Sequence, residues 1–271
     1  MAEYESAAPP IDHTVMDSPT MDNPFQSMQK LLWGFFLILL VGGIGFSIMG
    51  GAVDQAAGYE PSSSNIAGFM LVLGVQISMA FFAWRTIQRA DIDIQRLIGA
   101  KRPRYRWING LGWAIALLLF TLSSMATLAY GIVSLFPETI RDFMVQTLTR
   151  SAGQQNPLWI DGGMAIVGVI IAPVVEEFVF RGLFLHYWST HYSIQKGLIF
   201  AAILFAILHP QNFVGMFVFS LVMALLYIRT RNLWVPIGVH GIYNAIIFTP
   251  SLLGRIISEA LGTVADFENT A

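Results

Sequence analysis

Residues 31–53 read LLWGFFLILLVGGIGFSIMGGAV and contain no charged side chain. An α-helix needs about 20 consecutive apolar residues to cross the hydrocarbon core of a bilayer, so this run of 23 residues is long enough to span a membrane. A signal peptide would be shorter and would follow a basic segment, whereas the first thirty residues hold five carboxylates and one lysine. We therefore expect this span to be retained in the mature protein.

The rest of the chain has the same character, with 55% hydrophobic and 12% charged residues against about 25% charged in soluble domains. We predict an all-α fold, a polytopic membrane helix bundle of seven to eight transmembrane helices. After the first span, the predicted segments cover residues 66–84, 107–137, 162–188, 197–208, 213–228 and 233–253, and the last can continue into a short helix near 256–261. The absence of cysteine excludes disulfides, thiolate metal sites and a cysteine nucleophile.

Charge and turn residues divide the chain into five regions. We expect a disordered acidic tail, N-terminal helices with a basic loop at 85–106, an interfacial amphipathic helix with its loop, a helical core and a C-terminal tail. In that order the regions are 1–30, 31–137, 138–161, 162–255 and 256–271.

Basic residues predict the orientation. Residues 85–106 hold seven of the fifteen lysines and arginines, and short loops rich in these residues stay in the cytoplasm. Two spans precede this loop, so the N-terminus lies on the same side. This threading places eleven basic residues inside and three outside, namely Arg141, Arg150 and Arg255. We expect an integral protein of a bacterial plasma membrane with a cytoplasmic N-terminus.

Residues 173–181, PVVEEFVFR, put three charges inside an otherwise apolar segment. Each charge near the membrane midplane costs about 2.5–3.5 kcal/mol, so the bundle has to shelter them. At 100° per residue, Arg181 lies on the same helix face as Glu177 and far from Glu176. We predict a Glu177–Arg181 pair and a Glu176 side chain free for another task, with a kink at Pro173.

Two further polar pairs lie in apolar segments at helical spacing: Phe205 with His209, and His240 with Asn244. At 1.5 Å per residue, Glu176, His209 and Asn244 lie about 17–18 Å from the cytoplasmic ends of their segments, and His240 about 11 Å. Residues 197–208 are too few to cross about 30 Å of hydrocarbon. We therefore expect a turn at residues 210–212 inside the membrane and a polar cavity beside it.

A glutamate, two histidines and an asparagine around membrane water suit hydrolysis. Glu176 is a candidate general base, and His240 with Asn244 can donate to an oxyanion. His209 can hold the water or bind a metal. Glu176, His209 and His240 also match a His₂Glu zinc site, but the chain has no HExxH motif. Zinc-dependent and metal-free chemistry both remain open.

These residues resemble a known family. The patterns Glu176-Glu177-x-x-x-Arg181, Phe205-x-x-x-His209 and His240-x-x-x-Asn244, in this order on successive apolar segments, are similar to the three motifs of the CAAX protease and bacteriocin-processing family of intramembrane proteases, which includes the Ras-converting CAAX endopeptidases. The resemblance covers about residues 160–250. It implies an eight-helix intramembrane core and endopeptidase activity. The site it implies has Glu176 as the water-activating residue, Glu177 and Arg181 as its support, and His209, His240 and Asn244 as the remaining active-site groups.

Three functional classes follow. The first is an intramembrane endopeptidase acting on a prenylated or membrane-associated peptide. The second is a non-catalytic scaffold or immunity-type protein of the same fold, and the third is a proton-coupled transporter. We expect a peptide or protein substrate in or at the lipid bilayer as partner. No basic stripe interleaved with aromatic residues is present, so we expect no nucleic acid.

Overall fold

The computed structural model describes residues 24–56, 66–90, 92–99, 103, 105–135, 138, 142 and 156–270 of the 271. The regular elements in these ranges are all helical, which confirms the all-α prediction. Six of the described helices are long and apolar enough to cross a membrane, and one shorter apolar helix joins them. The first 23 residues, most of the predicted amphipathic helix at 138–150 and part of the basic loop lie outside the described residues.

Four helices precede the core: α1 (Pro24–Ala56), α2 (Ile66–Ala90), α3 (Ile94–Ile98) and α4 (Trp107–Leu135). The first two pack closely because small residues line their contact. A Cβ on Gly50 would lie 2.8 Å from the Cα of Ala67. Helix α1 begins at Pro24, so residues 24–30, which we expected in the tail, form its first turns. Hydropathy marks the membrane-buried part of a helix and not its end, which explains this difference.

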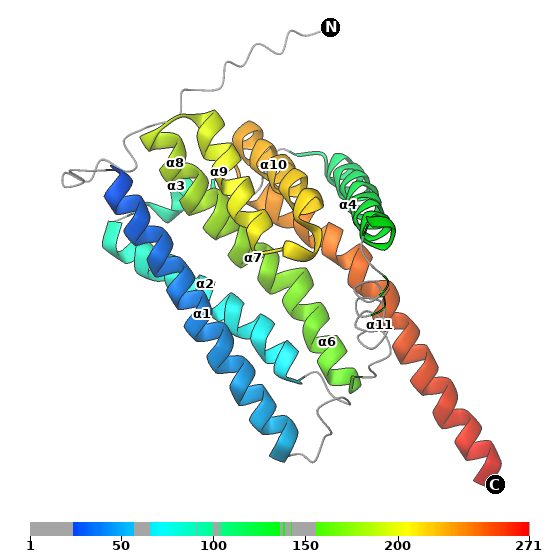
Figure 1. Ribbon diagram of the computed structural model, residues 1–271. Coiled ribbons are helices and arrows are strands. Elements are labelled where there is room, and N and C mark those ends of the chain that lie inside the picture. Colours follow the sequence, from blue (N-terminus) through cyan, green and yellow to red (C-terminus); the bar gives the residue numbers. More distant parts are fainter. Residues whose placement is uncertain are drawn as a thin grey trace, which may run out of the picture.

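A single long helix runs through the middle of the bundle (Figure 1) and alternates between α and π register. Its parts are α6 (Leu158–Ile166), η2 (Val167–Ile171), α7 (Ala172–Glu177), η3 (Phe178–Leu185) and α8 (His186–His191). The N–H of Ala172 donates to the carbonyl of Val167, five residues back. Pro173 follows it and has no N–H to donate. The helix therefore accommodates Pro173 by a change of register.

The remaining elements are α9 (Ile194–Ile207), η4 (Pro210–Asn212), α10 (Phe213–Thr230) and α11 (Trp234–Thr270). Helix α9 has 14 residues, or about 21 Å, and the chain turns at residues 210–212 as predicted. Asn212 stabilises this turn, because its Oδ1 accepts from Gly215 N at 3.2 Å and from Ser124 Oγ of α4 at 2.7 Å. The irregular backbone is thus paired within the protein, as a membrane interior requires.

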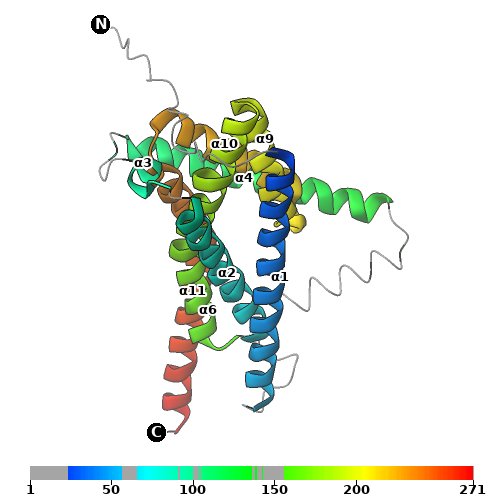
Figure 2. The same ribbon diagram turned by 90° about the vertical axis from the view of Figure 1, so that its left-hand side faces the viewer.

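Helix α11 continues to Thr270, so residues 256–261 are helical and continue the last apolar segment, and the region 256–271 that we expected to be a tail is helical up to that residue. Gly254 is compatible with a helix interior, and nothing between residues 253 and 256 ends the helix. Figure 1 shows α11 extending past the bundle at the C-terminal end. Helix α4 runs crosswise to α1 and α11, as Figure 2 shows.

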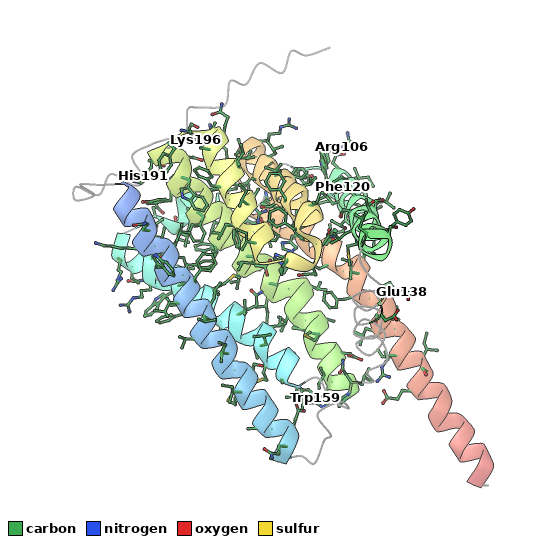
Figure 3. All side chains as sticks on the ribbon, in the orientation of Figure 1. Arg106, Phe120, Glu138, Trp159, His191 and Lys196 are labelled. Carbon is green, nitrogen blue, oxygen red and sulfur yellow. The ribbon has the colours of Figure 1, made fainter. Side chains whose placement is uncertain are left out.

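The core beside the central helix is aromatic. Phe184 stacks with Phe82 of α2 at 5.8 Å between ring centroids and meets Phe35 of α1 edge-on at 5.1 Å. Phe180 meets Phe205 of α9 edge-on at 5.0 Å. Figure 3 shows Arg106, His191 and Lys196 at one end of the bundle and Trp159 at the other. The charged residues of the central helix therefore lie between these two ends.

Candidate active site

Glu177 lies at the centre of a buried polar cluster. Its Oε1 accepts hydrogen bonds from Arg181 Nη1 at 3.1 Å and from His240 Nδ1 at 2.9 Å. Glu177 and Arg181 are both 0% exposed, and His240 is 5% exposed. The Glu177–Arg181 pair is thus formed as the helical spacing predicts, and it persists through the π register that starts at Phe178. The other oxygen of Glu177, Oε2, is buried and has no hydrogen-bond partner in the part of the chain that the structure describes.

Arg181 links the central helix to α10 and α9. Its Nη2 donates to the carbonyl of Ser220 at 3.1 Å and to Ser220 Oγ at 3.0 Å. Its guanidinium also lies over the ring of Phe205, 5.1 Å from the centroid. A buried cation is tolerated when it is paired and hydrogen-bonded, and Arg181 meets both conditions.

Glu176 faces α2 and not the Glu177–Arg181 pair, in agreement with the helical spacing, and is 6% exposed. Its Oε1 accepts from Nε2 of Gln76 on α2 at 2.8 Å. Gln76 is a site neighbour that sequence reasoning missed. The available signal was one amide in the middle of an otherwise apolar span. That signal does not name a partner, because the contact joins residues that are 100 positions apart.

Both histidine rings are held through the same nitrogen, Nδ1. His209 Nδ1 lies 2.9 Å from the carbonyl oxygen of Phe205, and His240 Nδ1 contacts the Glu177 carboxylate. Carbonyl and carboxylate oxygens only accept, so each Nδ1 carries a proton and Nε2 is the ring nitrogen that remains for another contact. Phe205 lies between them: it stacks on His209 at 4.5 Å and meets His240 edge-on at 6.3 Å.

Asn244 joins α11 to the first π segment. Its Nδ2 donates to the carbonyl of Gly168 at 2.6 Å. The backbone leaves this carbonyl open, because the N–H of Ala172 donates to Val167 instead and Pro173 has no N–H. One amide hydrogen of Asn244 is thus used in the fold. Its expected part as an oxyanion donor depends on the second hydrogen and stays a prediction.

Some of the predicted site residues are in contact with one another, and others are not. Glu177, Arg181 and His240 are in direct contact, and Phe205 places His209 beside them. Among the described residues, no hydrogen bond joins Glu176 to either histidine.

The fit to a metal can be tested on the candidate ligands. No three His, Asp or Glu side chains of the described chain come together as a ligand group. His240 Nδ1 contacts Glu177 Oε1, and the guanidinium of Arg181 binds this same oxygen. The set of Glu176, His209 and His240 does not fit a metal in this arrangement, and we derive no step through one.

A polytopic helical bundle that shelters two carboxylates, a guanidinium and an imidazole belongs to the class of integral membrane proteins with a buried polar site. Residues 158–246 match the family model described as type II CAAX prenyl endopeptidase Rce1-like. This match confirms the resemblance to the CAAX protease family over this segment, which holds all six predicted site residues. No curated protein and no solved structure matches the chain.

Proposed function

We propose that this protein is an intramembrane endopeptidase that hydrolyses a peptide bond of a prenylated or membrane-associated peptide, with Glu176 activating water. The match to the Rce1-like family model supports a CAAX-type endopeptidase. One observation carries the assignment of the base. Of two adjacent buried carboxylates, Glu177 is neutralised by Arg181, whereas Glu176 has a neutral amide as its partner. Glu176 is thus the carboxylate with capacity to accept a proton.

In the proposed reaction, Glu176 takes a proton from water while the water oxygen attacks the carbonyl carbon of the peptide bond. The carbonyl oxygen becomes an oxyanion. Glu176 then returns the proton to the leaving amine as the C–N bond breaks, so that atoms and charge balance. The base must lie within about 2.6–3.2 Å of the water that it deprotonates.

His240 is the proposed oxyanion donor. With Nδ1–H directed to Glu177, the ring can present only Nε2 to a substrate, and a protonated ring donates from that atom. The Glu177 carboxylate offsets the charge of such a ring, and the hydrogen bond fixes its orientation. His209, whose Nδ1 is held by its own helix, presents Nε2 in the same way and is the proposed group that holds the water.

The test is cleavage of a library of prenylated and membrane peptides by the purified protein and by Glu176→Gln. This change keeps the shape of the side chain, but an amide cannot take a proton from water, so we expect kcat to fall by about 10²–10⁴-fold. Glu259→Gln, at an exposed position of α11, is the matched control and should leave kcat unchanged. Full activity of Glu176→Gln would move the assignment to a non-catalytic protein of the same fold.

A further inference from the structure

Helix α2 carries a buried amide outside the segment that the family match covers. Gln76 lies ten residues after the start of α2, or about 15 Å into the helix. It shares the inward face with Met79 and Ala83, and the three are 4%, 2% and 5% exposed. The next residue, Ile77, is on the outer face and is 46% exposed. An amide at this depth and on this face requires an explanation, because an apolar residue would fill the position without burying polar atoms.

The hydrogen bonds of Gln76 give that explanation. Its Nε2 donates to Glu176 Oε1 at 2.8 Å, whereas its own Oε1 is buried and has no hydrogen-bond partner within the described segments. A carboxylate only accepts, so the NH₂ end of the amide has to face Glu176. Among the described residues, the contact with Glu176 is the one hydrogen bond that this side chain makes. A buried acceptor without a partner lowers the stability of the fold. Gln76 therefore provides a hydrogen bond to Glu176 but lowers folding stability.

We propose that Gln76 is a positioning residue that fixes the Glu176 carboxylate for proton transfer; this rests on the proposed role of Glu176 as the base. The last torsion of a glutamate side chain is soft, so a carboxylate on a helix face turns freely unless it is held. A hydrogen bond from α2 to Oε1 sets its plane and leaves Oε2 for the water. Helix α2, which the family match does not reach, thereby supplies one side chain, Gln76, that positions the proposed base.

The experiment compares Gln76→Met and Gln76→Glu with the wild-type protein on a peptide that the wild type cleaves. Both replacements keep the length of the side chain and remove the amide donor. We expect kcat to fall about 10-fold to 100-fold, the loss that a misplaced group typically causes. KM should stay within about twofold, because the interaction acts on the chemical step. Gln76→His, which retains an N–H donor, should recover part of the loss.

Ser78→Ala is the matched control. Ser78 is also buried on α2 but lies against Gly42 of α1, so its replacement should leave kcat unchanged. Wild-type kcat in Gln76→Met and Gln76→Glu, with Glu176→Gln inactive, would overturn this inference and leave Glu176 as the base. A fall in kcat that comes with an equal rise in KM and a lower melting temperature would also overturn it, since packing alone would then account for the effect. Activity in Glu176→Gln would instead remove the proposed function.

Discussion

The two neighbouring carboxylates of α7 face different surroundings. On one side, Glu177 is fully buried and accepts from a guanidinium and an imidazole through one oxygen. On the other side, Glu176 accepts from a single neutral amide. One helical step of 100° thus separates a carboxylate bonded to charged or chargeable groups of η3 and α11 from one that is held by a single neutral amide of α2. The difference indicates that Glu177 supports the fold and that Glu176 is left for chemistry.

The largest expected effect on stability tests this division. Glu177→Ala leaves Arg181 buried without its anion, and breaking a buried pair by removing one partner typically costs about 3–5 kcal/mol. Glu176→Ala leaves only the Gln76 amide without a partner, which typically costs about 1–3 kcal/mol. Thermal melts in detergent should therefore show a larger loss for Glu177→Ala. An equal or reversed order would contradict the division.

A double variant sharpens the same comparison. Glu177→Ala and Arg181→Ala together remove both charges, so their combined loss should be smaller than the sum of the single losses. Additive losses would show that the Glu177 and Arg181 side chains stabilise the bundle independently.

The sequence predicted the parts of this arrangement that depend on local geometry. Helical spacing was enough to pair Glu177 with Arg181, and the shortness of residues 197–208 was enough to place the turn before Phe213. Hydropathy predicted all seven apolar segments, because a bilayer requires long uncharged runs. It did not predict where α1 begins or that α11 continues to Thr270, since helices extend beyond the apolar run.

The contacts that sequence reasoning did not predict depend on tertiary packing or on backbone register. The Gln76–Glu176 hydrogen bond requires α2 to lie against α7, which no local pattern indicates. The contact from Asn244 to Gly168 depends on the π segment, because an α-helical register would change which carbonyl is open. From the sequence, His240 was predicted to donate to the oxyanion, but its hydrogen bond with Glu177 was not predicted.

A smaller loss of stability is expected when Asn244 of α11 is replaced. Asn244→Ala leaves the Gly168 carbonyl without this donor, and because the contact is only partly buried the loss should be at most about 1–3 kcal/mol. Pro173→Ala restores a backbone N–H that can donate to Gly168 in the π register. The double variant should therefore recover the melting temperature of the wild type.

The rate of peptide cleavage separates two roles of Asn244. If its second amide hydrogen also donates to the oxyanion, the double variant stays about 10²–10³-fold slower than the wild type although its stability has returned. Recovery of both stability and rate would show that Asn244 acts through the backbone alone. No recovery of stability would contradict the account of the open carbonyl.

The smallest effect should come from an ion pair away from the buried cluster. Arg255 Nε of α11 lies 3.3 Å from Asp161 Oδ2 of α6, with the side chains 32% and 23% exposed, and this Nε makes no hydrogen bond to any residue that the structure describes. Partly exposed pairs contribute about 0–1 kcal/mol and weaken as salt screens them. Asp161→Asn should therefore lower stability by less than about 1 kcal/mol in low salt and by nothing measurable in about 1 M salt, where the Debye length is about 3 Å. The loss in Glu177→Ala should be the same at both salt concentrations, because burial shields that pair from ions. A loss in Asp161→Asn as large as that in Glu177→Ala, or one that salt does not change, would show that the contact between α6 and α11 holds the bundle as strongly as the buried cluster does.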